Sequence, residues 1–179
     1  MAAKYDGFTT FEQQQMANAF QRMQRASAAA KKALLGGDLA AFQKWFDGTG
    51  KNAHLMKVST IVNEVDQAIL SRPITFAKLD RPGVRVDTRN LCGYVWLIQQ
   101  GGQAFHVGTG MRIMVVWSTH IGQSVDYMAQ TMYHELTHKV GSTNDSNYNE
   151  QACLGYAKTA PHMAANNAEN FNLFLREYL

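Results

Sequence analysis

The sequence Tyr-His-Glu-Leu-Thr-His-Lys at residues 133–139 decides both the expected fold and the expected chemistry of this chain. Residues four apart on an α-helix lie one above the other, so His134 and His138 can offer both imidazole rings to one metal ion. Glu135 lies one step around the helix, beside the open position of that metal. Two neutral nitrogen ligands and a carboxylate that takes a proton from zinc-bound water are what a metallopeptidase needs. The motif therefore predicts a zinc site, and two solvated histidines on a helix face are the alternative interpretation.

The residues around this motif favour a helix. No Pro or Gly occurs between residues 124 and 140, and Gly141 follows as the expected C-terminal stop. An apolar stripe repeats every four residues, at Met128, Met132, Leu136 and Val140. The two histidines fall on the other side of the cylinder. The pattern predicts a buried helix with one face in the core and one face that carries the ligands.

A catalytic zinc ion takes a third protein ligand. The metzincin pattern would place it at position 144, where this chain has Asn144, a poor zinc ligand. A gluzincin would use a Glu from the next helix, and Glu150 is the candidate for that role. Only 11 residues separate it from His138, which is short for a reversal into a second helix. Asp145 is therefore the preferred third ligand, with Glu150 as the alternative.

At this point the chain resembles the aspzincins, the family of deuterolysin and peptidyl-Lys metalloendopeptidase. Their signature is His-Glu-x-x-His followed by Gly-Thr-x-Asp-x-x-Tyr-Gly. Residues 142–149 read Ser-Thr-Asn-Asp-Ser-Asn-Tyr-Asn, so the Thr, Asp and Tyr are in register, while Ser142 and Asn149 replace the two glycines. The similarity extends from about residue 26 to the C-terminus and includes Asn-Ala-Glu-Asn-Phe at residues 167–171.

The resemblance implies a zinc-dependent endopeptidase. The implied ligands of the single zinc ion are His134, His138 and Asp145. Glu135 would act as the general base, and Tyr148 would donate a hydrogen bond to the oxyanion of the tetrahedral intermediate. A catalytically inactive zinc-binding interaction module is the alternative from another class, and the presence of Glu135 argues against it.

The resemblance also suggests where substrate binds. Glu169 stands where Lys-specific members have an acidic residue of the pocket for a Lys side chain after the scissile bond. Asn172 stands where those enzymes have a second acid, so we expect a preference for Lys rather than strict selection. The strand at about residues 112–117 is expected to bind extended substrate by strand addition. Of the other histidines, His162 is an outside candidate for a zinc ligand.

Composition indicates one compact domain. The 179 residues are 46% hydrophobic and 17% charged, which is ordinary for a folded protein. We expect one zinc metallopeptidase domain over residues 1–179, in which residues 1–25 form a peripheral helical extension. No apolar run approaches the ~20 residues of a membrane span, so no membrane contact is expected. The net charge of +3 comes without an aromatic-interleaved basic motif, so nucleic acid is not an expected partner.

The order of elements predicts an α+β, zincin-like fold. It consists of a helical N-terminal half, a small sheet, the His-Glu-x-x-His helix and C-terminal helices. Helices are expected over residues 12–35, 38–46, 51–70, 146–159 and 168–178, and the sheet between residues 74 and 117.

Localisation and redox state are less constrained. The N-terminus lacks the apolar core of a signal peptide. We nevertheless expect a secreted or extracellular protein, with an intracellular one as the alternative. Secreted fungal members carry paired cysteines, whereas this chain has only Cys92 and Cys153, which form either one disulfide or two free thiols. Peptides or proteins are the expected substrates, and an inhibitor or immunity protein is left open.

Overall fold

The computed structural model describes residues 3–80, 93–94, 98–100, 103–105 and 110–179. Cys92 and part of the expected sheet region between residues 74 and 117 lie outside the described residues. The helices are α1 (Thr10–Leu35), α2 (Ala40–Trp45), α3 (Leu55–Ser71), α4 (Val125–Gly141), α5 (Glu150–Thr159), α6 (Pro161–Ala164) and α7 (Ala168–Arg176). The strands are β1 (Lys4–Asp6), β2 (Ile74–Lys78), β3 (Gly93–Tyr94), β4 (Ile98–Gln100), β5 (Gln103–Phe105) and β6 (Met111–Val115), and a 3-10 helix spans Trp117–Thr119. The expected α+β order is confirmed.

The long helix α1 begins with a capping box. The Thr9 hydroxyl accepts from the backbone N–H of Glu12, and the Glu12 carboxylate accepts from the backbone N–H of Thr9, which satisfies two donors of the first turn. The same carboxylate pairs with Lys78 on β2 at 2.7 Å, which ties the helix start to the sheet. Met16 and Met23 are buried in the main core. Residues 1–25 are therefore not a peripheral extension, because the first half of α1 supplies apolar side chains to the core.

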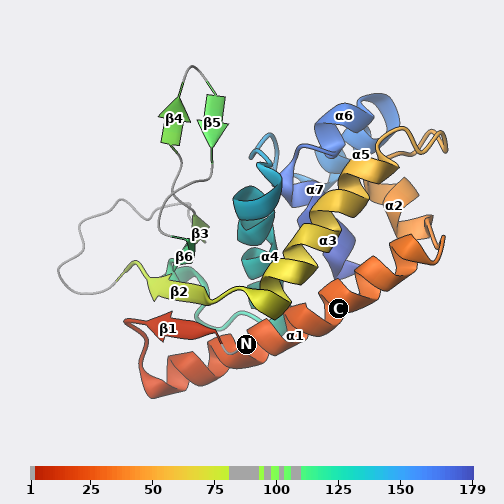
Figure 1. Ribbon diagram of the computed structural model, residues 1–179. Coiled ribbons are helices and arrows are strands. Elements are labelled where there is room, and N and C mark those ends of the chain that lie inside the picture. The colour runs from red at the N-terminus through yellow and green to blue at the C-terminus, as the bar shows by residue number, and fades with distance from the viewer. Residues whose placement is uncertain (1–2, 81–92, 95–97, 101–102, 106–109) are drawn as a thin grey trace.

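The sheet has four strands in the order β1-β2-β6-β3. β1 and β2 are parallel, β2 and β6 are parallel, and β3 runs antiparallel to β6. β4 and β5 form a separate hairpin that projects away from the helices in Figure 1. β3 pairs with β6 at Met114 and Val115, and β2 pairs with β6 along its other side. The prediction that the strand at residues 112–117 binds substrate by strand addition is therefore wrong at Met114 and Val115. A strand with neighbours on both sides offers no free edge to a substrate.

Helix α4 lies at the centre of the molecule. It packs against α1, α3 and α7 and against the strands β3 and β6 (Figure 1). The predicted apolar stripe is buried at Met128, Met132 and Leu136, with exposed fractions of 3% or less. Ser124 caps the N-terminus by accepting from the backbone N–H of Tyr127. Burial of this stripe fixes the rotation of the helix, which turns its other face toward an open pocket.

The C-terminal end of α4 differs from the expectation. Gly141 is the last helical residue, and the left-handed cap is Ser142, with φ of 49°. A β-carbon at Gly141 would lie 2.8 Å from the Cγ2 of Ile61, so this glycine permits the close approach of α3 rather than the turn. Ser142 adopts the backbone conformation that the glycine of the family signature would adopt at lower cost.

Two later helices start further along the chain than expected, and a short one was not expected. α3 begins at Leu55 because the buried carboxylate of Asp47 holds the backbone N–H groups of Thr49 and Ala53 in a preceding loop. α5 begins at Glu150, after Asn149 caps it through the backbone N–H of Ala152. Residues 142–149 are therefore loop, which leaves Asp145 and Tyr148 free to turn back toward α4. The short helix α6 starts at Pro161, which suits a first helical position.

Candidate metal centre

Three predicted ligand side chains come together at the C-terminal half of α4. The Nε2 atoms of His134 and His138 lie 3.2 Å apart. The Oδ1 atom of Asp145 lies 3.0 Å from the first nitrogen and 3.1 Å from the second. Ligand atoms around a tetrahedral zinc ion stand about 3.3 Å apart, given bonds of about 2.0–2.1 Å. The triangle therefore has nearly the size that one zinc ion requires.

The hydrogen-bond partners of the two imidazole rings indicate that this triangle suits a cation. The Nδ1 of His138 lies 2.8 Å from the backbone carbonyl oxygen of Thr143, which can only accept, so Nδ1 carries the proton. The Nδ1 of His134 lies 3.4 Å from the Oε2 of Glu169, again an acceptor. When both rings are neutral, both Nε2 atoms therefore point lone pairs at each other and at the Asp145 carboxylate. Three facing acceptors repel one another unless a cation lies between them, so the donor set fits zinc.

Charge around the centre also favours a cation. Burial alone would lower the pKa of His134, but the carboxylates of Asp145 and Glu169 outweigh it and raise that pKa to about 10. Burial alone would raise the pKa of Asp145, but the contacts of this carboxylate with the two histidines hold its pKa well below the usual range. The carboxylates therefore make this point of the structure attractive to a positive charge, whether a proton or a metal ion.

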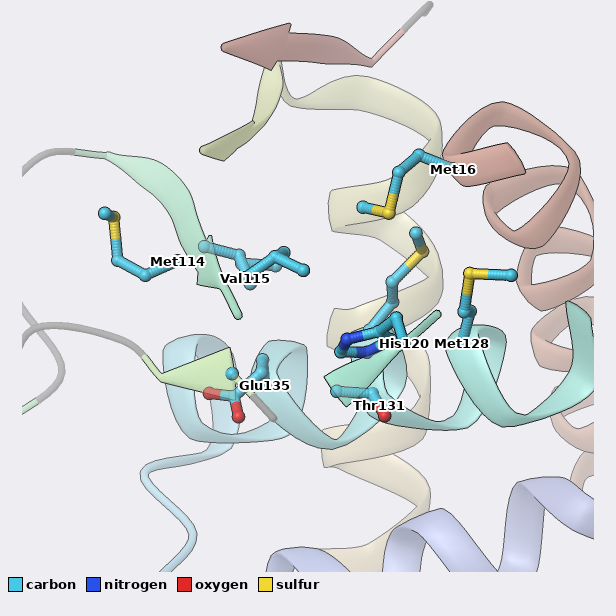
Figure 2. Close-up of a pocket in the computed structure, with 10 residues that line it drawn as sticks. Met16, Met114, Val115, His120, Met128, Thr131 and Glu135 are labelled. Carbon is cyan, nitrogen blue, oxygen red and sulfur yellow. The ribbon is translucent and has the colours of Figure 1, made fainter. Parts of the chain in front are cut away.

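Glu135 is buried next to the ligands, with an exposed fraction of 4%. It borders a small apolar cavity, whose lining includes Met16, Val115 and Met128, labelled in Figure 2. Among the described residues, its Oε2 atom has no hydrogen-bond partner. Burial raises the pKa of Glu135, and the Asp145 carboxylate adds to this, against the histidines. A carboxylate that is poorly solvated binds a proton more readily, as a general base should.

A larger pocket opens on the other side of Glu135, with a volume of about 310 Å³. It is lined by Gly93, Tyr127, Gln130, Thr131, His134, Glu135, Tyr148, Glu169, Asn172, Leu173 and Arg176. A β-carbon at Gly93 would lie 3.1 Å from both the Cγ and the Oε1 of Glu135. Strand β3 thus passes directly over the Glu135 carboxylate because residue 93 has no side chain.

Tyr148 reaches the same pocket from the loop after α4. Its ring stacks on that of His134, with centroids 5.8 Å apart and an interplanar angle of 18°. The residue is 63% exposed, which leaves it open to a substrate. Burial of part of the ring and the Asp145 carboxylate raise the pKa of Tyr148, so the phenol stays protonated and can donate.

Glu169 has two contacts that its sequence position did not reveal. Its Oε2 faces the Nδ1 of His134, as described above, and Asn172 Nδ2 donates to both of its carboxylate oxygens at 3.0 Å. Among the described residues, Asn172 Oδ1 has no hydrogen-bond partner. Glu169 therefore orients a ligand of the candidate metal centre as well as lining the pocket, an arrangement common around histidine ligands.

Other sequence candidates lie outside the group. Glu150 forms a two-point ion pair with Arg176, at 3.0 and 2.8 Å, and the one metal-binding group in the described part of the chain does not include it. His162 is likewise not in that group. His120 is buried with its Nδ1 2.9 Å from the carbonyl oxygen of Val116, and it stacks on Trp117. Cys153 is a buried free thiol.

Two residues of the site were missed from the sequence. Gly93 lies over Glu135, and Asn167 holds the loop that contains Asp145 through bonds to the backbone of residues 146 and 147. The sequence resemblance over residues 167–171 included Asn167, but without a role. A glycine in a strand pattern, and an Asn just before a helix, were the available signals.

Comparisons with known proteins agree with this geometry. A helix-borne His-Glu-x-x-His motif that meets a third, acidic ligand defines a zinc metallopeptidase. The aspzincins, described as lysine-specific metallo-endopeptidases, match residues 29–176, and the chain belongs to this family. A zinc peptidase from Grifola frondosa has a similar fold, with a TM-score of 0.75, 20% identity, and coverage of 95% of this chain and 97% of that one. The comparison with curated proteins found no match.

The enzyme class expected from the sequence is thereby confirmed. The chain is a zinc-dependent metalloendopeptidase that acts on peptide or protein substrates. In the described residues, no helix is long and apolar enough to cross a membrane.

Proposed function

We propose that this protein cleaves peptide bonds with Glu135 as general base and Tyr148 as oxyanion donor, around a zinc ion held by His134, His138 and Asp145. The observation that carries the proposal is the triangle of three acceptor atoms beside a buried, poorly solvated carboxylate. Zinc, when bound there, supplies Lewis acid chemistry and lowers the pKa of a water molecule toward neutrality.

The roles of the protein groups follow from their surroundings. Glu135 takes a proton from the attacking water at its carboxylate and passes it to the leaving amine. Its apolar flank and the close backbone of Gly93 exclude solvent from one side, which strengthens its affinity for the proton. The Tyr148 hydroxyl donates to the oxygen on which negative charge develops. Gly93 of β3 lines the pocket and none of the described residues of β6 does, so we expect the substrate backbone to run beside β3.

Replacement of Tyr148 by Phe tests the oxyanion role. We expect kcat to fall by about 10²–10³-fold, because a lost oxyanion donor commonly costs about 3–4 kcal/mol. KM should change less than about threefold, since the ring that stacks on His134 is retained. Steady-state kinetics on a fluorogenic peptide measures both constants. An unchanged kcat would leave Tyr148 with a packing role only.

We also propose that the pocket prefers Lys just after the scissile bond. The ammonium of a Lys side chain would meet the Glu169 carboxylate, which lines this pocket. A hydrogen bond to a charged group contributes about 1.5–3 kcal/mol, which corresponds to about 10–100-fold in selection. Arg176 on the same pocket opposes a second cation, although its pairing with Glu150 moderates this. The balance supports preference rather than strict selection.

Sequencing the new N-termini from a proteome digest tests the activity and the preference together. We expect cleavage that stops when a chelator removes zinc and resumes when zinc is restored, with Lys enriched at the first new position. Asn172→Asp should increase that enrichment, because it supplies a second acid. Glu169→Gln is a poorer test, since Glu169 also contacts His134.

Two outcomes of this digest would count against the proposal. Cleavage that continues without metal would remove the zinc mechanism. Equal use of all residues by both the wild type and the Asn172 variant would remove the pocket assignment. Secretion, expected from the resemblance to secreted relatives, stays a prediction.

A further inference from the structure

Asn167 lies wholly buried just before α7 and faces the loop that follows α4. Its Oδ1 accepts from the backbone N–H of Ser146 at 2.9 Å and of Asn147 at 3.2 Å. Its Nδ2 donates to the backbone carbonyl of Asn147 at 3.0 Å. One carboxamide therefore uses both of its ends on the two residues directly after Asp145.

Asn167 is itself held in place by a second buried amide. Its Nδ2 also donates to the Oδ1 of Asn170 at 2.8 Å. Asn170 in turn donates to the backbone carbonyls of Trp45, at 2.6 Å, and Cys153, at 3.1 Å. The amide pair thereby anchors the loop to the C-terminal end of α2 and to α5.

The backbone on the other side of Asp145 is fixed to the same segment. The N–H of Asn144 donates to the carbonyl of Asn166 at 2.7 Å, and the N–H of Ala168 donates to the carbonyl of Asn144 at 2.9 Å. Asp145 is therefore flanked on both sides by residues whose backbone is bonded to residues 166–168. Its own side chain is 43% exposed, so burial does not hold it toward the histidines.

We propose that Asn167 is a positioning residue that holds Asp145, and with it Tyr148, in place before the metal binds. Fixing a residue costs conformational entropy, and this cost is met on folding when the loop is already bonded. Metal binding then loses less free energy to ordering. The inference rests on the proposed ligand role of Asp145.

The side chain at position 167 must be both donor and acceptor. An Asp has nearly the same shape but presents only acceptors when ionised. In Asn167→Asp, a carboxylate oxygen would face the carbonyl of Asn147 and the Oδ1 of Asn170, both of which accept. Repulsion should release the loop. Asp47→Asn is the matched control, because Asp47 is equally buried and its carboxylate also holds backbone N–H groups of a loop, those of Thr49 and Ala53, which is not the loop of Asp145.

The test is a zinc titration against a chelator of known affinity, with thermal unfolding of the zinc-free proteins. We expect Asn167→Asp to weaken zinc binding by about 10–100-fold, as is typical for residues that orient metal ligands. Asp47→Asn should lower the unfolding temperature of the zinc-free protein but leave zinc affinity within about threefold. Equal zinc affinity in Asn167→Asp and the wild type, or equal loss in both variants, would overturn the proposal.

Hydrogen exchange provides a test that needs no substitution. The amides of Ser146 and Asn147 donate to Asn167, although Ser146 is an exposed residue. We expect both to exchange slowly in the zinc-free wild type, and fast exchange would contradict preorganisation. Failure of the proposed function would give a different result from failure of the Asn167 proposal. If the wild type binds zinc through Asp145 but cleaves no peptide, the result for Asn167 still holds.

Discussion

The Glu135→Gln protein is expected to bind zinc as tightly as the wild type and to lose peptide hydrolysis. The amide cannot accept the proton of the attacking water, and a general base contributes about 10²–10⁴-fold to the rate. The fold should not suffer. Glu135 is buried with an oxygen that has no hydrogen-bond partner among the described residues, so removal of its charge relieves a desolvation cost.

Three measurements on one sample check this: zinc content, unfolding temperature and kcat on a fluorogenic peptide. We expect the unfolding temperature of the zinc-free variant to be equal to or above that of the wild type. Glu150→Gln is a suitable control, because this carboxylate pairs with Arg176 away from the ligand triangle. Undiminished hydrolysis by Glu135→Gln would assign the base to another group.

The second large effect concerns the third ligand. We expect Asp145→Ala to weaken zinc binding by more than about 100-fold, since even residues that only orient ligands cost about 10–100-fold. Glu150→Ala should change zinc affinity by less than about threefold. Asp145 lies 3.0 and 3.1 Å from the two Nε2 atoms, whereas Glu150 is engaged by Arg176. Chelator competition measures both affinities. The reverse order would replace the aspzincin ligand set by a gluzincin one.

The central part of this fold could be predicted from the sequence because its signals are local. The four-residue apolar repeat fixed which face of α4 is buried, and the spacing of His134 and His138 placed both rings on the opposite face. Asp145 could not be identified from periodicity, because a loop has no repeating pattern of buried residues. The poor fit of Asn144 and Glu150, and the register of Asp145 with the family signature, pointed to it.

The remaining features depend on contacts between distant segments. Strand β1 is three residues long and pairs in parallel with β2, some 70 residues further along the chain, so no local pattern reveals it. The roles of Gly93 and Asn167 exist only because β3 and α7 pack against α4 and its loop. Glu169 was expected in a substrate pocket, and its contact with His134 becomes visible only when α7 lies against α4.

The framework around the ligands has a consequence for when the enzyme becomes active. Apolar contacts hold α4 against α1, α3 and α7, and amide hydrogen bonds hold the following loop. These contacts join protein groups to one another, so none of them is made by the zinc ion. We therefore expect the chain to fold without zinc and to cleave no peptide until the ion binds.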